Sequence, residues 1–212
     1  MKQRAARLAL AAILALAAPL AAAETLVVGS KRFTESYVLG EVIARTAAAA
    51  GAKATHRAGL GNTAIVYAAL RSGEIDVYAE YTGTIAREIL QRDADLPLDA
   101  LNRELAPLGL AASVPLGFNN TYALAMREDA RGIRTISDLA RHPDLRLGLT
   151  QEFLGRADGW PGLKQRYGLP HAPTGGLDHG LAYEALAAGR IDVKDVYATD
   201  AKIARYGLRV LA

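Results

Sequence analysis

The chain has 212 residues, a formal net charge of +3 and no cysteine. The absence of cysteine excludes disulfides, thiolate zinc sites, cysteine nucleophiles and a lipid-modified cysteine anchor. Three cations, Lys2, Arg4 and Arg7, lie at the extreme N-terminus. The rest of the chain is therefore close to neutral, and its charge does not favour nucleic acid as a partner.

Residues 1–23 show the pattern of a secretory signal peptide. A cationic start precedes an apolar segment over residues 8–20, which is too short to span a bilayer comfortably. Ala21-Ala22-Ala23 then supplies the small residues of a cleavage site. We therefore predict a mature chain that begins at Glu24, is released into the periplasm and does not itself span a membrane.

Short apolar strands alternate with amphipathic helices in the first half of the chain. A strand over 26–29 ends in glycine, and Thr34 or Ser36 can cap a helix that runs to about Ala50. After these the pattern predicts a strand over 55–58, a helix from Asn62 or Thr63 to Arg71, a strand over 75–79 and helices over 84–91 and 98–108.

The second half of the chain continues this alternation. The pattern predicts a strand over 122–127, a short helix over 137–140, a strand over 145–149 and a helical region over 153–167 that Gly and Pro interrupt. A strand-like run over 208–212 follows. Strands that alternate with helices indicate an α/β fold with largely parallel sheets.

Two stretches of the chain resemble each other. Residues 59–77 have the sequence GLGNTAIVYAALRSGEIDV, and residues 175–193 have the sequence GGLDHGLAYEALAAGRIDV. Each predicts a helix, a glycine that can end it and an Ile-Asp-Val strand start, followed by a loop with a tyrosine, Tyr81 or Tyr197. An α/β sheet holds its ligands beyond the carboxyl ends of its strands. We therefore expect two similar lobes that present Tyr81 and Tyr197 to one cleft.

Other positions shared by the two stretches favour structural roles. Asp76 and Asp192 could form a pair of acid and base carboxylates, but their identical place in both stretches favours capping or turn hydrogen bonds. Tyr67 and Tyr183 lie on helix faces in both stretches and are expected in the core.

Six short strings carry a resemblance to a known family. In chain order they are Gly29-Ser30-Lys31-Arg32-Phe33-Thr34-Glu35, Gly73-Glu74-Ile75-Asp76-Val77-Tyr78, Glu80-Tyr81-Thr82-Gly83-Thr84, Phe118-Asn119-Asn120-Thr121-Tyr122, Glu152-Phe153-Leu154-Gly155-Arg156-Ala157-Asp158-Gly159 and Thr199-Asp200. Together they resemble the substrate-binding proteins of osmoprotectant ABC importers, the glycine betaine/choline/carnitine group. The resemblance implies capture of such a solute and its delivery to permease subunits driven by an ATPase.

The resemblance also implies a domain organisation. It predicts a two-lobed periplasmic binding protein fold of type II-like form, with a first lobe over 24–120 and a second over 121–200. The hinge is expected near 119–122 on the outward crossing and near 199–202 on the return. Residues 201–212 would begin a return segment whose remainder, with a fourth aromatic wall, is expected to be missing. A smaller departure from the family pattern is Ala79, where the family often has proline.

The chemistry of such ligands explains the residues that the resemblance assigns to the site. A quaternary ammonium has no N–H group to donate, so the faces of aromatic rings hold it in a cation–π cage. By resemblance, Tyr81, Tyr122 and Tyr197 would form this aromatic cage. A ligand carboxylate needs cations and hydroxyls, and by resemblance these are Lys31, Thr84 and Arg156. No cofactor is implied.

Two other classes of function remain open from the sequence. An enzyme is disfavoured because the chain has neither a G-x-S-x-G motif nor a Walker loop. His171, His179 and Asp178 could be taken for a metal cluster, but their Gly- and Pro-rich setting favours a surface loop. Trp160, between Gly159 and Pro161, is expected to pack in a loop. The second class is a binding protein or sensor for another small solute such as an amino acid, whose α-ammonium group needs an acidic acceptor.

Overall fold

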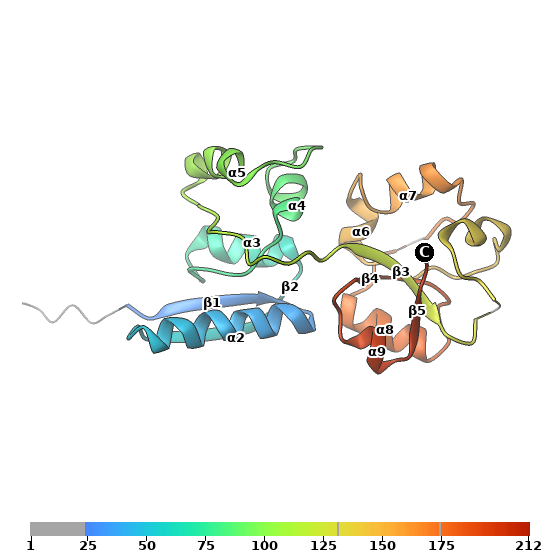
Figure 1. Ribbon diagram of the computed structural model, residues 1–212, viewed down its shortest axis with the longest axis horizontal. Helices are drawn as coiled ribbons and strands as arrows, with labels where there is room; N and C mark the ends of the chain where they lie inside the picture. The colour runs from blue at the N-terminus through green and yellow to red at the C-terminus, as the bar shows by residue number, and fades with distance from the viewer. Residues whose placement is uncertain (1–23, 131, 174) are drawn as a thin grey trace, which may run out of the picture.

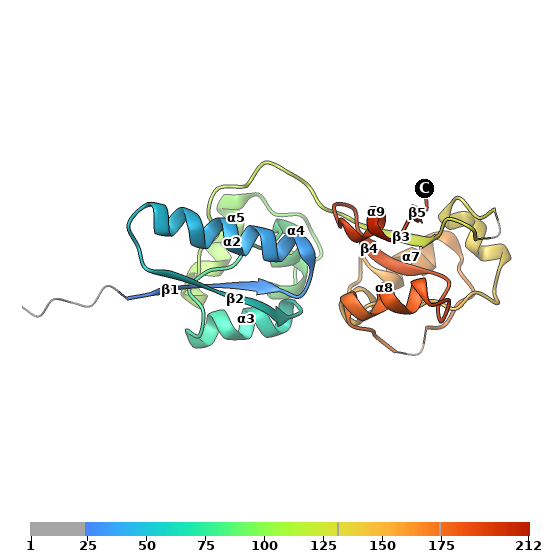
Figure 2. The ribbon, with the colours of Figure 1, turned by 90° about the horizontal axis from the view of Figure 1, so that it is seen from below.

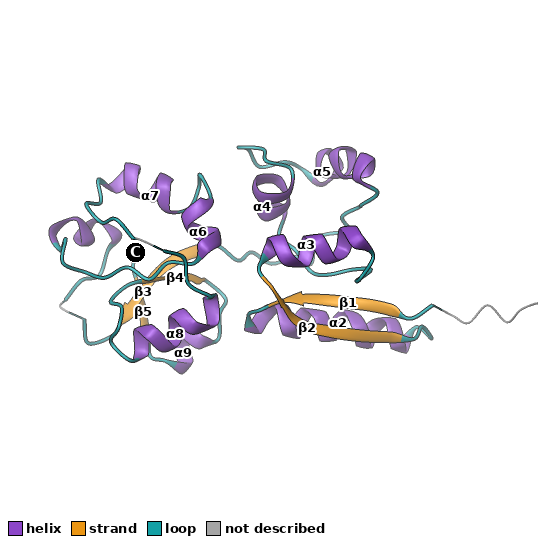
Figure 3. Cartoon of the chain, turned by 180° about the vertical axis from the view of Figure 1, so that it is seen from behind, coloured by secondary structure: helices purple, strands orange, loops and turns teal. Residues whose placement is uncertain are grey.

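The computed structural model describes residues 24–130, 132–173 and 175–212. These residues form two lobes that lie side by side along the long axis of the molecule (Figures 1 and 2). An extended segment between residues 109 and 121 joins them and is drawn as loop in Figure 3. None of the described helices combines the length and the apolar character that a membrane crossing needs. The predicted signal peptide lies outside the described residues.

A two-stranded parallel sheet forms the centre of the first lobe. Strand β1 (Leu26–Lys31) pairs with β2 (Ala54–Gly61). Helix α2 (Thr34–Ala49) covers one face of this sheet and α3 (Thr63–Ser72) the other (Figure 2). The Asn62 side chain caps α3 by accepting a hydrogen bond from the backbone N of Ile65, which decides between the two caps expected from the sequence, Asn62 and Thr63.

A second layer of short helices completes the first lobe. The single turn α4 (Thr82–Thr84) continues into the π-helix η1 (Ile85–Ile89), and α5 (Leu98–Leu105) continues into the 3₁₀-helix η2 (Ala106–Leu108). Apolar side chains from η1 and α5 pack together in a small core of Ile85, Ala86, Leu101 and Leu105. This packing holds Thr84 and its neighbours facing the second lobe.

An antiparallel sheet forms the centre of the second lobe. Strand β3 (Tyr122–Arg127) lies between β4 (Lys194–Tyr197) and β5 (Leu208–Val210). The helices of the second lobe are η3 (Ile136–Arg141), α6 (Gln151–Gly155), α7 (Trp160–Tyr167), α8 (His179–Ala187) and α9 (Lys202–Arg205). The largest group of buried apolar side chains in the described residues belongs to this lobe and includes Leu124, Leu149, Phe153 and Trp160.

The structure corrects two strand predictions. The expected strands over 75–79 and 145–149 are reduced to isolated bridges, Val28 with Val77 and Leu147 with Val193. An aspartate side chain takes the place of a backbone acceptor in the strand pairing of the first lobe, because the backbone N of Val27 donates to Asp76 Oδ2 over 2.6 Å. The expectation of largely parallel sheets fails in the second lobe, because β3 pairs antiparallel with strands that follow it far along the chain.

The predicted return crossing at residues 199–202 is wrong. Asp200 is buried in the second lobe and accepts a hydrogen bond from Tyr183. The chain then continues in the same lobe, because Ile203 and Leu208 pack against its core and β5 pairs with β3. The segment 201–212 therefore extends the second lobe instead of leaving it.

Candidate ligand-binding site

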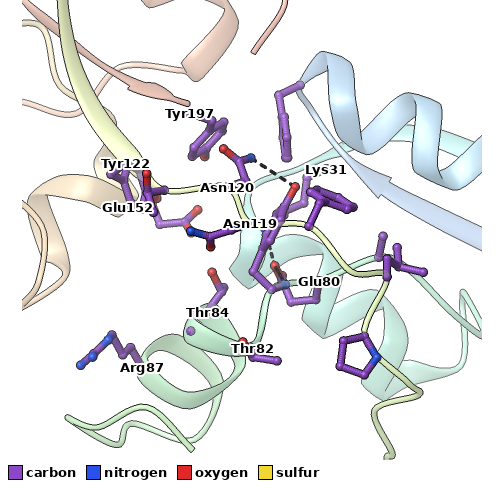
Figure 4. A pocket seen from close by; sticks show the side chains of 18 of the residues that line it. Lys31, Glu80, Thr82, Thr84, Arg87, Asn119, Asn120, Tyr122, Glu152 and Tyr197 are labelled. Atoms are coloured by element: carbon purple, nitrogen blue, oxygen red, sulfur yellow. Dashed lines mark hydrogen bonds and ion pairs between the residues drawn. The ribbon is translucent and has the colours of Figure 1, made fainter. Parts of the chain in front are cut away.

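A pocket of about 630 Å³ lies between the two lobes. All six residues that the sequence assigned to the site line this pocket: Lys31, Tyr81, Thr84, Tyr122, Arg156 and Tyr197. Lys31, Tyr81 and Thr84 come from the first lobe, and the others come from the second. Figure 4 labels Lys31, Thr84, Tyr122 and Tyr197 around the pocket. The walls also contain residues without a sequence-assigned role, among them Phe33, Glu80, Phe118, Asn120, Glu152 and Asp158.

Two of the tyrosines are brought together by strand register. Tyr122 at the start of β3 pairs with Tyr197 at the end of β4, and their ring centroids are 5.2 Å apart. Phe33 from the first lobe approaches Tyr197 to 4.7 Å. Burial raises the pKa of both tyrosines well above the usual value, so both are neutral phenols whose ring faces can attract a cation.

Tyr81 approaches the pocket from the first lobe. Its hydroxyl donates to Glu35, and Asn120 Nδ2 donates to the same Glu35 carboxylate over 3.1 Å and to the Tyr81 hydroxyl over 3.2 Å. Asn120 Oδ1 also accepts from the backbone N of Thr199 in the second lobe over 3.3 Å. Asn120 thus connects both lobes at the pocket wall. From the sequence, Asn120 was expected in the hinge near 119–122 and was not assigned to ligand contact.

Lys31 is held by a neighbour from its own lobe. Its Nζ lies 2.6 Å from Glu80 Oε1, and both side chains are almost completely buried. Burial raises the pKa of Glu80 above its usual value, and the Lys31 charge opposes this shift. The Lys31 ammonium also lies 5.5 Å from the centroid of the Tyr81 ring and 5.7 Å from that of Phe33. These rings therefore present faces that a cation can approach.

Arg156 is held in a similar way in the second lobe. Its guanidinium makes two hydrogen bonds to Asp158, of 2.9 and 2.8 Å, and lies 5.4 Å from the Tyr122 ring centroid. Across the cleft it reaches Thr84 Oγ1 at 3.4 Å. Arg87 of the first lobe approaches Asp158 to 3.0 Å. Polar contacts between the lobes thus surround this end of the pocket.

Glu152 is a pocket residue that the sequence analysis did not single out. It lies in the short helix α6, and its Oε1 accepts a hydrogen bond of 2.9 Å from Thr63 Oγ1 of the first lobe. It stands four positions before Arg156 in the string that carried the resemblance. A carboxylate in the same short string as an assigned ligand residue was the signal that could have found it.

The other residues that the sequence singled out make contacts typical of a structural role. Trp160 is buried in the core of the second lobe. Asp192 accepts from the backbone N of Arg146 over 2.9 Å, the same role that Asp76 has in the first lobe. His171 contacts the His142 carbonyl, whereas His179 contacts Asp200. Tyr183 is fully buried, as expected, while Tyr67 is only half-buried.

Comparison with known families defines the class of protein. A family model described as the substrate-binding domain of ABC-type glycine betaine transport systems matches residues 24–212. The chain belongs to this family, which confirms the resemblance drawn from the six strings.

Curated relatives agree with the family assignment. A glycine-betaine-binding protein of Pseudomonas aeruginosa is 36% identical over 208 residues, which cover 89% of this chain and 67% of the relative. The ergothioneine transport permease/ergothioneine binding protein EgtU of Helicobacter pylori is 34% identical over 194 residues, 88% of this chain and 35% of that protein. The glycine betaine-binding protein YehZ of Escherichia coli is 29% identical over 217 residues, 90% of this chain and 70% of the relative.

Solved structures show the same fold. A crystal structure of a glycine betaine/carnitine/choline ABC transporter protein matches with a TM-score of 0.59 and 26% identity, over 89% of this chain and 73% of that one. Apo YehZ from Escherichia coli matches with a TM-score of 0.55 and 28% identity, over 90% and 75%. The predicted α/β, two-lobed periplasmic binding protein fold is confirmed.

Proposed function

We propose that this chain is an extracytoplasmic solute-binding protein that captures a quaternary ammonium osmoprotectant in the pocket between its lobes. Glycine betaine, choline and carnitine are the ligands we consider. The protein would then deliver the ligand to the permease subunits of an ABC transporter and their ATPase. Family membership and the functions for which the relatives are named support this proposal over an amino-acid binder and over an enzyme.

The observation that carries the proposal is the meeting of aromatic rings from both lobes at one pocket. Tyr81 and Phe33 come from the first lobe, and Tyr122 and Tyr197 come from the second. A trimethylammonium group cannot be recognised by hydrogen bonds, and several ring faces around it supply the alternative attraction. A pocket divided between two lobes also allows ligand binding to favour their closed arrangement.

We assign the polar side of the pocket to the other end of the ligand. Thr84 and Arg156 contact each other across the cleft at 3.4 Å, and Lys31 lies beside the Tyr81 ring. Cations and a hydroxyl in this arrangement suit an oxygen-bearing end group, either a carboxylate or a hydroxyl. We propose Lys31, Thr84 and Arg156 as the residues that contact this end.

The export of the protein is also a proposal. A signal peptide over residues 1–23 would carry it to the periplasm, where a solute-binding protein meets its permease. Fractionation of cells that express the full chain, with N-terminal sequencing of the exported product, tests this. We expect the exported form to begin at Glu24. A full-length product retained in the cytoplasm would contradict the assignment.

Calorimetric titration of the purified protein tests the ligand class. Glycine betaine, choline and carnitine form the first group of ligands, and proline and arginine form the second. We expect binding of at least one member of the first group and none of the second, because only quaternary ammonium ligands match the rings. Binding of arginine or proline with no response to the first group would contradict the proposed function.

A further inference from the structure

The charged side chains in the pocket walls do not balance. Four carboxylates and three cations line the pocket: Glu80, Asp95, Glu152 and Asp158 against Lys31, Arg87 and Arg156. Three of the carboxylates lie close to cations of the pocket. The pairs are Lys31 with Glu80 at 2.6 Å, Arg87 with Asp95 at 3.0 Å and Arg156 with Asp158 at 2.8 Å, and Arg87 also reaches Asp158 at 3.0 Å. Glu152 is the carboxylate that remains.

Among the residues that the structure describes, Glu152 has a hydrogen-bond partner but no cationic one. Its Oε1 accepts from Thr63 Oγ1 over 2.9 Å. Within residues 24–130, 132–173 and 175–212, no lysine, arginine or histidine nitrogen lies within ion-pair distance of this side chain. A neutral hydroxyl satisfies one lone pair of a carboxylate but does not offset its charge. The pocket therefore carries one negative charge that no pair within its walls compensates.

The charge of Glu152 shifts the pKa of other groups around the pocket. Burial raises the pKa of the Tyr197 hydroxyl, and the Glu152 charge is the next largest cause. Burial likewise raises the pKa of Glu88, again with Glu152 as the next largest cause. Figure 4 shows the Glu152 side chain directed from the second-lobe side toward Asn119 and the centre of the pocket, near Tyr122. A ligand between the rings would meet this negative field.

Glu152 also stands where two cavities meet. A second cavity of about 340 Å³ shares Lys31, Phe33, Glu152 and Tyr197 with the main pocket. Phe33 and Tyr197 approach each other at this boundary. A ligand whose ammonium lies against Tyr122 and Tyr197 would therefore have Glu152 beside it.

We infer that Glu152 is a specificity-determining residue, which makes the pocket prefer a quaternary ammonium ligand with net positive charge and a hydroxyl, as in choline, over one with its own carboxylate, as in glycine betaine. The inference rests on the proposed function and refines it. The carboxylate attracts the ammonium and accepts a charge-assisted hydrogen bond from the ligand hydroxyl. It repels a ligand carboxylate, while the cations that would compensate this repulsion are already paired.

Calorimetric titration of the wild-type protein and three variants with choline and glycine betaine tests the inference. Glu152→Gln removes the charge and keeps the shape of the side chain. Thr63→Val removes the hydrogen bond between the lobes and keeps the carboxylate, so it separates an effect on lobe closure from an effect on the ligand. Glu184→Gln, at an exposed position of α8 outside both cavities, is the matched control for loss of one negative charge.

We expect Glu152→Gln to weaken choline binding by about ten- to hundredfold, which is the affinity lost when a hydrogen bond to a charged group is removed. Glycine betaine should bind the same variant unchanged or more tightly. Thr63→Val should change both affinities by a similar factor and keep their ratio, and Glu184→Gln should change neither.

Three results would overturn the inference. The first is an equal loss for both ligands in Glu152→Gln, and the second is an unchanged choline affinity in that variant. The third is a shift of the choline-to-betaine ratio in Thr63→Val that equals the shift in Glu152→Gln, because Glu152 would then act through closure. In each of these the wild-type protein still binds a quaternary ammonium ligand, so the proposed function survives. A wild-type protein that binds neither ligand would overturn the proposed function together with the inference.

Discussion

Residues 59–77 of the first lobe and 175–193 of the second build the same local unit in different surroundings. A side chain caps each helix, Asn62 in one lobe and Asp178 in the other. Each helix is followed by a glycine with positive φ, 75° at Gly73 and 66° at Gly189, which a side chain at that position would disfavour. The local similarity in sequence is therefore a similarity in backbone structure.

The tyrosines that follow these units differ in what surrounds them. The Tyr197 ring stacks on His179 at 4.2 Å and also contacts Phe33 and Tyr122. Tyr81 has one aromatic neighbour among the described residues, Phe118 at 6.3 Å, and its hydroxyl donates to Glu35. Tyr197 is thus part of a packed aromatic cluster, whereas Tyr81 is held mainly by polar contacts. Tyr81 and Tyr197 therefore hold equivalent positions in the two stretches but should contribute differently to the free energy of unfolding.

Truncation of the two tyrosines should give the largest difference between the lobes. We expect Tyr197→Ala to lower the free energy of unfolding by about 3 kcal/mol, because it leaves a cavity among packed rings. Tyr81→Ala should lower it by about 1 kcal/mol, since it removes polar contacts at a half-buried site. Both variants should weaken ligand binding, by about 0.5–2 kcal/mol for each ring lost. Urea denaturation followed by circular dichroism measures stability, and calorimetry measures affinity. Equal losses of stability would show that the aromatic cluster does not distinguish the two sites.

The two helix tyrosines offer a smaller test of the same comparison. The Tyr183 hydroxyl is buried and donates to Asp200 Oδ2 over 2.9 Å. Tyr67, its counterpart in the first lobe, is half-buried, and no hydrogen bond of its hydroxyl occurs in the described part of the chain. We expect Tyr183→Phe to cost about 1–2 kcal/mol of stability and Tyr67→Phe to stay within about 0.5 kcal/mol of wild type. A larger loss in Tyr67→Phe would reverse this assignment.

The smallest expected effect is the pH dependence of stability that His179 contributes in the second lobe. Burial lowers the pKa of His179 below its usual 6.5, although the hydrogen bond to Asp200 opposes the shift. The unfolded chain therefore takes up a proton at higher pH than the folded protein does, so stability falls as the pH drops through about 6.5. Thr63, the counterpart of His179, does not titrate in this range.

His179→Phe provides the variant for this pH dependence. It keeps a ring against Tyr197 and removes the titrating group, so the decline of stability between pH 7 and pH 5 should become shallower. The measurement is the urea midpoint at several pH values. An unchanged slope in His179→Phe would assign the acid sensitivity to groups other than His179.

Much of the site was predictable because its residues lie in short local motifs. Tyr81, Tyr122 and Tyr197 end or begin elements whose patterns are clear in the sequence, and all three line one pocket. The predicted strand over 122–127 agrees with β3 at both ends. Local propensity and turn chemistry decide such features.

The features that the sequence did not reveal depend on contacts between distant segments. Strand β3 pairs with β4 and β5, which follow it far along the chain, and no local pattern sets that order. Tertiary arrangement also decides that Lys31 pairs with Glu80 and that, in the described part of the chain, no cation lies within ion-pair distance of Glu152. The error at residues 199–202 has the same origin, because Asp200 is held by Tyr183 and His179 of the same lobe.

The most direct test of a cation-binding aromatic pocket compares choline with its uncharged carbon analogue, 3,3-dimethylbutan-1-ol. The two molecules have nearly the same shape and the same hydroxyl, and they differ in the charge of the central atom. Calorimetric titration of the wild-type protein with each should show at least about tenfold tighter binding of choline, because only choline gains the attraction to the ring faces. Equal affinities, or tighter binding of the uncharged analogue, would contradict a cation–π site between the lobes.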